Sequence, residues 1–384
     1  MTQKIIQFKR NMTLILVLGF IFTYLLNHLV NNISLGGNNF SQGDWLINSY
    51  AGLTRRFMFG DILLYLSDFF DIGLLKLLAI FQGCILFFLL FNLYILKDLI
   101  PGWLFWIFLT SPAFFPFFWV LDPLGAFRKE IIIYFAIFAQ ILAFKRSSIY
   151  IYVFSLLLAL IAFLSHEALV LFSPIIILIN YLYYDGVFRS EVKAVYSVLI
   201  AVFALIGICF GILFSNSVVS SDLCAVLMQR NLSPQICSGA IAWLNYPSSY
   251  GFADWDIFKI IEKSISQILS YIIFISPLFF VMMRAGSPWS EIRWLLLLGL
   301  PFLPLYFVAV DWGRWLNFHV FSIYIITLVL FQTKRLHFTE MISKKVVLAV
   351  ISFQLLIASP GHTGNFKVFQ LIKIVLEDLI GTEI

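Results

Sequence analysis

Charged residues are scarce in this sequence. Asp, Glu, Lys and Arg make up 12% of its 384 residues, about half their share in a typical soluble domain. Hydrophobic residues make up 61%, against roughly 45–50% in soluble domains. This composition excludes a soluble globular protein. The net charge of +5 must first be divided between the two faces of a membrane, and nucleic-acid binding is not indicated.

Several catalytic motifs are also absent. The sequence contains no Walker lysine loop, no His-Glu-x-x-His and no Gly-x-Ser-x-Gly, so ATP hydrolysis and zinc proteolysis are not expected. Its four cysteines show no metal-ligand spacing with histidine. Asp254 and Asp256 are a close carboxylate pair of the kind that holds Mg²⁺, but without a nucleotide-binding fold such a short match is typical of a solvated loop. We expect neither a metal nor a cofactor.

Long apolar runs recur along the whole chain. About 20 helical residues cross a hydrocarbon core roughly 30 Å thick. The sequence therefore predicts an all-α, polytopic helical membrane protein, a single membrane domain over residues 1–384, with an uncleaved first helix. About eleven spans are expected, near Met12–Val30, Ile72–Ile95, Gly102–Leu121, Ile131–Phe144, Ile149–Leu164, Ala168–Tyr184, Ala194–Ser215, Ser264–Met283, Trp294–Val310, Leu316–Phe331 and Val346–Ala358. The last is short enough to be an interfacial or re-entrant piece instead.

The distribution of charge predicts a cytoplasmic N-terminus. In that orientation the cytoplasmic segments carry fourteen basic and five acidic residues, and the outer segments carry ten basic and fifteen acidic ones, as the positive-inside rule expects. The main outer loops are then residues 31–71 and 216–263. Amphipathic interfacial helices are expected at Phe57–Phe70 and Phe366–Ile380. Cys224 and Cys237 share the second loop, where they either form a disulfide or remain free thiols.

Unusual polar residues gather on the predicted outer side. Ionisable groups at membrane depth persist mostly when they are paired or line a polar cavity, so their convergence on one face predicts a functional site. They fall in four places, namely the loop with Asp44, Arg55, Arg56 and Asp61, the turn Asp122–Glu130, the turn Ser165–Glu167, and the turn Asp311–Trp315.

Arginine side chains in these turns indicate anion binding. The guanidinium fork forms bidentate bonds to phosphate oxygens, so Arg55, Arg56, Arg128 and Arg314 could surround one diphosphate. The alternative is that Arg55 and Arg56 grip lipid headgroups and that Arg314 pairs locally with Asp311.

Acid–base chemistry is predicted from the nearby carboxylates and histidine. His166 and Glu167 share a very short turn, where partial removal from water would raise the pKa of the carboxyl and suit it to proton transfer. They could equally cap two helix ends. Asp44 and Asp61 are further candidates, or ordinary loop carboxylates. Six of the ten tryptophans lie on the outer side, as sugar stacking or an interfacial belt would require, and the aromatic loop around Tyr250 could form a lid.

The pattern resembles the bacterial membrane glycosyltransferases that use polyprenyl-linked sugars, and within them the O-antigen or capsular polysaccharide polymerases. The resemblance rests on the helix number, the Phe-, Ile- and Leu-rich composition, the large outer loop, and the clusters at Arg55–Arg56, Arg128 and Asp311–Arg314. The chain departs from that pattern in two ways. No glycine follows Arg55 or Arg128 at the eleventh position, and the first outer loop lacks closely paired acids.

The resemblance implies an undecaprenyl-diphosphate oligosaccharide as substrate, at the outer face of the bacterial inner membrane. The glycan would move from one lipid carrier to a sugar hydroxyl on the next, without a metal, and a chain-length regulator would be a further partner. Arg128 and Arg314 would hold the diphosphate with help from Arg55 or Arg56 and support from Asp122 and Asp311. The residues near the acceptor hydroxyl would be Glu167, His166 or Asp44.

Other functions compete with this interpretation. A lipid-linked oligosaccharide flippase would move the same substrate without bond chemistry, but the sequence shows no convincing internal repeat and its charges gather at one face. Another polyprenyl-phosphate-sugar glycosyltransferase is a further alternative. An acyltransferase using His166 and Glu167, or a structural subunit of an envelope complex, has the least support.

Overall fold

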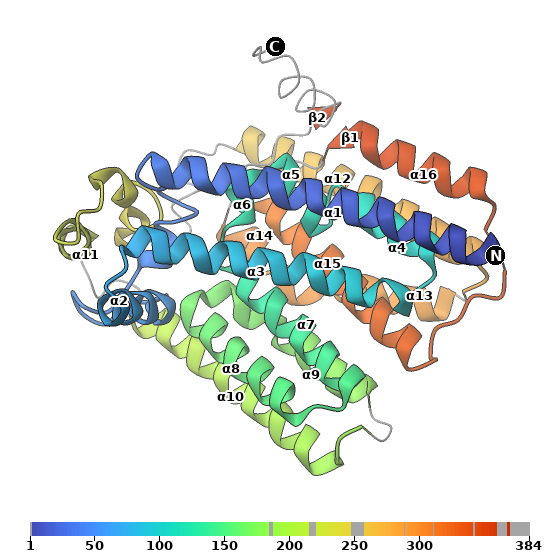
Figure 1. Ribbon diagram of the computed structural model, residues 1–384, viewed down its shortest axis with the longest axis horizontal. Coiled ribbons are helices and arrows are strands. Elements are labelled where there is room, and N and C mark those ends of the chain that lie inside the picture. Colours follow the sequence, from blue (N-terminus) through green and yellow to red (C-terminus); the bar gives the residue numbers. More distant parts are fainter. Residues whose placement is uncertain are drawn as a thin grey trace. The chain divides into compact units, whose positions relative to one another are not determined.

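Helices make up nearly all the regular structure. A computed structural model describes residues 2–183, 187–214, 220–246, 257–287, 289–309, 311–340, 342–358 and 367–368 (Figure 1). This confirms the all-α prediction, apart from the two-residue strands β1 (Ile357–Ala358) and β2 (Lys367–Val368), which pair antiparallel. The α-helices are α1 (Thr2–Ser34), α2 (Met58–Phe70), α3 (Leu74–Leu96), α4 (Gly102–Thr110), α5 (Phe115–Leu121), α6 (Pro123–Ala126), α7 (Glu130–Arg146), α8 (Ile149–Ser165), α9 (Ser173–Leu182), α10 (Ser190–Leu213), α11 (Ser220–Met228), α12 (Ile257–Arg284), α13 (Trp289–Leu297), α14 (Leu305–Val308), α15 (Trp312–Gln332) and α16 (Lys344–Leu356). The 3₁₀ helices are η1 (Asp44–Leu46), η2 (Lys97–Leu99), η3 (Glu167–Phe172), η4 (Pro234–Cys237), η5 (Ala242–Asn245) and η7 (Leu300–Phe302).

The chain divides into two compact units, each assembled from separate stretches of sequence. Unit 1 comprises residues 1–97, 126–173 and 186–247, and unit 2 comprises residues 98–125, 174–185 and 248–384. Three of the predicted polar places contribute residues to unit 1: the first outer loop, the turn at Arg128 and the turn at Glu167. Arg314 and Asp311 belong to unit 2, as does Asp122.

Six described helical segments are long and apolar enough to cross a membrane. They are Asn11–Ser34, Leu74–Leu99, Gly102–Leu121, Ser190–Leu213, Ile260–Arg284 and Trp312–Gln332. Each coincides with one of the predicted spans. The other five predicted spans are shorter or interrupted, and the number of about eleven stays a prediction, as does the cytoplasmic N-terminus.

Prolines and short 3₁₀ turns interrupt several of the predicted spans. The segment from Trp289 to Val308 is divided into α13, η7 and α14, with Pro301 and Pro304 at the breaks, because a proline lacks the backbone N–H that continues a helix. A similar break with Pro112 separates α4 from α5. The predicted span Ala168–Tyr184 is η3 followed by α9.

In unit 1, α7 and α8 form an antiparallel hairpin, with α10 packed against α8 (Figure 1). The hairpin turns at Ser147, whose φ of 51° is left-handed, and the Ser148 hydroxyl accepts from the Ile151 N–H to cap α8. Gly207 lets α10 approach closely, because an added Cβ would lie 2.9 Å from the Val170 side chain and 3.0 Å from the Phe163 carbonyl. Helix α10 therefore packs closely against the end of α8 and against η3, on both sides of the turn that joins them.

Helix α2 is amphipathic, as predicted for Phe57–Phe70. Figure 1 draws it nearly end-on, whereas α1 and α3 run across the view side by side. Its buried residues follow a helical period, and the opposite face exposes large aromatic side chains. The exposed aromatic residues are Tyr65, Phe69 and Phe70. Its predicted place at a membrane interface stays a prediction.

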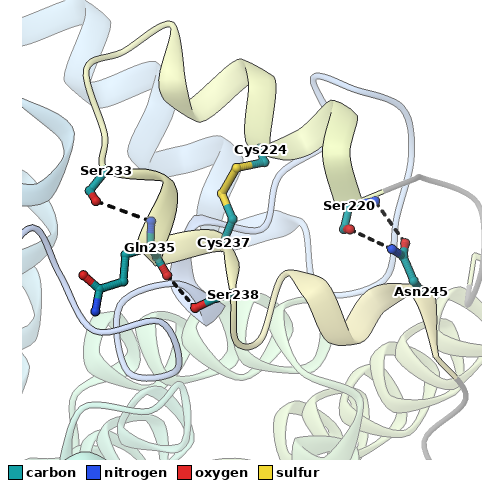
Figure 2. Close-up of a disulfide and its surroundings, with 7 residues drawn as sticks. All are labelled: Ser220, Cys224, Ser233, Gln235, Cys237, Ser238 and Asn245. Atoms are coloured by element: carbon teal, nitrogen blue, oxygen red, sulfur yellow. Dashed lines mark hydrogen bonds between the residues drawn. A yellow bond between two sulfur atoms is a disulfide. The ribbon is translucent and has the colours of Figure 1, made fainter.

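Part of the predicted second outer loop forms a disulfide-linked segment, residues 220–246. Cys224 at α11 and Cys237 at η4 form a disulfide (Figure 2). Ser220 and Asn245 close the segment, because the Ser220 N–H donates to the Asn245 side chain at 3.0 Å, and Asn245 Nδ2 donates to the Ser220 hydroxyl at 2.7 Å. The predicted lid around Tyr250, the pair Asp254–Asp256 and the predicted helix at Phe366–Ile380 lie outside the described residues, apart from β2.

Candidate functional site

Seven polar side chains of unit 1 gather where three separate segments meet. The segments are the first outer loop, the turn that precedes α7, and the turn between α8 and η3. We name this group the charged cluster. It consists of Asp44, Arg55, Arg56, Arg128, Lys129, His166 and Glu167.

Buried amide and indole groups hold two of these segments together. The Phe127 carbonyl accepts from Trp45 Nε1 at 2.6 Å and from Gln82 Nε2 at 2.8 Å. Gln82, on α3, also donates to the Ser41 carbonyl at 2.9 Å and accepts from Gln42 Nε2 at 2.9 Å. Because all these groups belong to buried residues, each unmade bond would be costly. The network therefore fixes Asp44 and the residues after Phe127 relative to each other.

Lys129 lies at the centre of the charged cluster with 0% of its surface exposed. Its Nζ donates to the Arg56 carbonyl and to the Ser165 carbonyl, both at 2.9 Å. Burial lowers the pKa of this ammonium to about 8, although the negative charge of Asp44 acts in the opposite direction. The sequence interpretation gave Lys129 no role.

Arg56 and Glu167 form the closest ion pair of the charged cluster. Arg56 Nε donates to Glu167 Oε2 at 2.7 Å, and Arg56 Nη2 donates to Oε1, which makes the pair bidentate. Arg55 Nη1 lies 3.7 Å from the same Oε1. Arg56 has a left-handed backbone with φ 70°, which is uncommon for a non-glycine residue.

The prediction of a raised pKa for Glu167 is wrong. Burial acts to raise the pKa of this carboxyl, but the charge and hydrogen bonds of Arg56 outweigh it and hold the pKa well below its usual range. The side chain is 28% exposed, so the pair remains in contact with solvent. Glu167 is therefore an ionised carboxylate at neutral pH.

His166 is a neutral cap in this structure. Its backbone is extended, and its Nδ1 accepts from the Ala168 N–H at 3.2 Å, which caps η3. Burial, with help from the charge of Arg56, lowers the pKa of this imidazole to about 3. The alternative of a polar helix cap therefore describes His166, whose Nδ1 is occupied by the Ala168 N–H.

Asp44 is a buried carboxylate with unused hydrogen-bonding capacity. Its surface is 1% exposed, and neither carboxylate oxygen has a hydrogen-bond partner among the described residues. Arg56 Nη1 lies 3.6 Å from Oδ1. Burial acts to raise the pKa of Asp44, but the surrounding cations, Lys129 first, hold it below its usual value. Asp61, by contrast, accepts from the Ser49 N–H at 2.7 Å and organises the loop.

Within the described part of the chain, two arginines retain donors that no neighbour uses. The Nε of Arg55 and that of Arg128 have no hydrogen-bond partner among the described residues. Arg128 lies over the Phe40 ring, 5.1 Å from its centroid, and is 8% exposed. Arg55 Nη2 makes only long bonds of 3.4 Å to the carbonyls of Trp243 and Tyr246. The disulfide-linked segment therefore provides two backbone carbonyls that contact the Arg55 guanidinium.

The predicted residues of unit 2 have local partners. Arg314 pairs with Asp311 and stacks over the Trp315 ring at 5.2 Å. This is the local pairing that the sequence left open. Asp122 closes the short turn of α6, where its carbonyl accepts from the Gly125 N–H at 2.9 Å. The joint use of Arg314 and Arg128 around one diphosphate stays a prediction.

The charged cluster has an excess of positive charge. With His166 neutral, its described members comprise four cations and two carboxylates, namely Arg55, Arg56, Arg128 and Lys129 against Asp44 and Glu167. Electrostatic interactions between buried charges are strong because water screens them little. An anion that brings two or more negative charges would balance this excess, and the unused guanidinium donors are suited to phosphate oxygens.

Comparison with known proteins gave no relative, since no family model, no curated protein and no solved structure matches the chain.

Proposed function

We propose that this chain is a multi-pass glycosyltransferase of the bacterial inner membrane that joins lipid-linked oligosaccharide repeat units into surface polysaccharide. The observation that carries the proposal is the buried excess of positive charge, with unused arginine donors, in segments that the charge distribution predicts to lie at the outer face. Six apolar helices of membrane-spanning length support the membrane part of the proposal.

The cluster's chemistry suits departure of a lipid diphosphate. When the glycosidic bond to the diphosphate breaks, negative charge develops on the leaving oxygen, and preorganised cations lower the barrier to that step. Arg128 and Arg55 offer free donors for this purpose. Arg56 is held by Glu167 at a fixed position beside them. Four cations in this arrangement would make a metal ion unnecessary.

Asp44 is our choice for the group that accepts the proton of the attacking sugar hydroxyl. Its low pKa keeps it ionised, and both of its oxygens are free to accept a hydrogen bond. Glu167 already uses both oxygens on Arg56, and His166 Nδ1 already accepts from the Ala168 N–H. The new glycosidic bond forms as the hydroxyl proton moves to Asp44 and the diphosphate leaves with the electron pair.

Deletion of the gene in its bacterial host tests the proposal, with surface glycolipids resolved on a gel. We expect long polysaccharide ladders to vanish while lipid A core bearing one repeat unit persists. Loss of the single-repeat band as well would favour a flippase or an earlier glycosyltransferase. An unchanged pattern would remove the chain from this pathway.

Complementation then assigns residues. The plasmid-borne variants Arg128→Ala and Asp44→Asn should fail to restore ladders at normal protein level, because each lies in the cluster, and Arg314→Ala tests the predicted contribution of unit 2. Arg230→Ala is the matched control, since this arginine pairs with the exposed Asp68 outside the charged cluster. Full ladders with Arg128→Ala would exclude it from the diphosphate site.

A further inference from the structure

Lys129 connects the two halves of the Arg56–Glu167 pair through the backbone. One of its acceptors is the carbonyl of Arg56 itself, and the other is the carbonyl of Ser165, two residues before Glu167. These acceptors come from the loop before α2 and from the end of α8. A single ammonium group therefore joins two segments that are far apart in sequence.

Lys129 binds the backbone at a residue with an uncommon conformation. Arg56 has a left-handed backbone, which such a residue keeps only when its surroundings hold it. The Lys129 ammonium binds the carbonyl of this same residue. Removal of the ammonium would leave two polar carbonyls without this donor in a buried place, and they would move to find other partners.

We propose that Lys129 is a positioning residue of the anion site, and that anion binding there depends on its ammonium group. The inference rests on the proposed function, because the anion it concerns is the lipid diphosphate. Lys129 acts on the bound anion through Arg56, whose guanidinium it places, and through the positive charge that it adds at the centre of the cluster.

A pH dependence follows from the groups that face Lys129. These are Asp44 from η1, Arg56 from the loop before α2, and His166 and Glu167 from the turn after α8. Burial lowers the pKa of Lys129 to about 8, whereas Asp44 and Glu167 keep their charge, because the pKa of each is held below its usual value. Anion affinity should therefore fall as pH rises through about 8.

Inorganic pyrophosphate is the probe, titrated into the purified full chain in lipid nanodiscs by calorimetry. Pyrophosphate itself gains negative charge as pH rises, which alone would strengthen binding, so a loss of affinity must come from the protein. We expect wild-type affinity to fall about tenfold or more between pH 7 and pH 9. Lys129→Met should bind weakly at every pH, and Lys129→Arg should retain its affinity at pH 9.

Lys145→Met is the matched control. Its Nζ also donates to a backbone carbonyl, that of Ile95 at 3.1 Å, but at an exposed position outside the charged cluster. This variant should follow the wild-type profile. Lys129→Met with wild-type affinity and pH profile would overturn the inference. Should both Lys129 variants fail to fold, the wild-type profile decides, because affinity that is constant or rises with pH contradicts it.

The same titration distinguishes this inference from the proposed function. A wild-type chain that binds pyrophosphate, and loses it in Arg128→Ala, but shows no dependence on Lys129 would overturn only the role of Lys129. A wild-type chain that binds no pyrophosphate would overturn both.

Discussion

The balance between burial and neighbouring charge sets the chemistry of single residues in the charged cluster. Burial alone disfavours every ionised form. For Asp44 and Glu167 the adjacent cations are strong enough to reverse that effect, whereas for Lys129 the carboxylates offset it only in part. The cluster therefore keeps both carboxylates charged at neutral pH and leaves Lys129 close to losing its proton. One side chain in the site is thus sensitive to mildly alkaline pH.

The Arg56–Glu167 pair should stabilise the fold in a pH-dependent way. The pKa of Glu167 is lower in the folded chain than in the unfolded one, so its contribution is present above its unfolded pKa, about 4.3, and is lost as pH falls through the folded value. Thermal unfolding between pH 3 and 7 should show a smaller loss on acidification for Glu167→Gln than for the wild type. Glu191→Gln, at an exposed site on α10, should behave as the wild type.

A double-mutant cycle measures the strength of that pair. Arg56→Met, Glu167→Gln and the double variant should give a coupling free energy of about 1–3 kcal/mol, because the pair is bidentate and largely buried. An exposed pair typically gives only about 0.2–1 kcal/mol. A coupling near zero would show that the two side chains do not depend on each other.

Which residues enter the charged cluster was partly predictable. The sequence identified every member of the cluster except Lys129, because charge is rare in this chain and the polar residues gather in a few turns between apolar runs. It missed Lys129, because nothing in the turn Asp122–Glu130 distinguishes a solvated lysine from one that is fully buried. It also gave the wrong direction for the pKa of Glu167, since partners 111 residues apart leave no local pattern.

At the scale of elements, the close contact between α10 and the end of α8 positions the turn that carries Glu167. Gly207 permits it, because a Cβ there would meet the Val170 side chain and the Phe163 backbone. We expect Gly207→Ala to lower stability by about 1–3 kcal/mol from overpacking, measured by thermal unfolding, and to weaken pyrophosphate binding.

Gly19→Ala is the control for that substitution. Gly19 also lies inside a helix, but an added Cβ there meets nothing within 4 Å. The helix preference of alanine should then leave stability unchanged or raise it by about 0.5–1 kcal/mol. Equal effects at the two positions would mean that α10 does not approach the Phe163 backbone closely.

The disulfide should stabilise the segment whose backbone carbonyls contact Arg55. Cys224 and Cys237 are 13 residues apart, and closure of a loop of about 15 residues contributes roughly 3 kcal/mol in the chain-entropy account. A reducing agent, or the double change Cys224→Ser and Cys237→Ser, should lower the unfolding temperature and weaken pyrophosphate binding. The exposed free thiols give the control, since Cys84→Ser and Cys209→Ser should change neither.

Helix positions were more predictable than helix continuity. Hydropathy located the six membrane-length helices, because long apolar runs have few alternatives in a bilayer. The interruptions in α13–η7–α14 and in η3–α9 were missed, because averaging hydropathy along a window hides proline and 3₁₀ turns. The sequence left the disulfide open for a similar reason, since pairing depends on how α11 and η4 pack.

At the scale of the whole molecule, the proposal requires the charged cluster and the disulfide-linked segment to share the outer side. The two are linked in unit 1, because the Asn39 carbonyl in the first loop accepts from the Ala240 N–H at 3.0 Å and Arg55 bonds to the Trp243 carbonyl. A disulfide needs an oxidising compartment. The positive-inside rule, applied to the distribution of basic residues, predicts the same orientation.

Labelling with a membrane-impermeant thiol reagent in intact cells checks this orientation. In a background carrying Cys84→Ser and Cys209→Ser, we expect Leu35→Cys to be labelled from outside, and Tyr150→Cys to be labelled only after the membrane is opened. Both side chains are exposed in the fold, so a difference between them reports sidedness. Tyr150 follows the basic pair Lys145–Arg146, which the charge distribution assigns to the cytoplasm. Labelling of Tyr150→Cys from outside would contradict the predicted topology. The charged cluster would then face the cytoplasm, where a lipid diphosphate in the outer leaflet could not reach it.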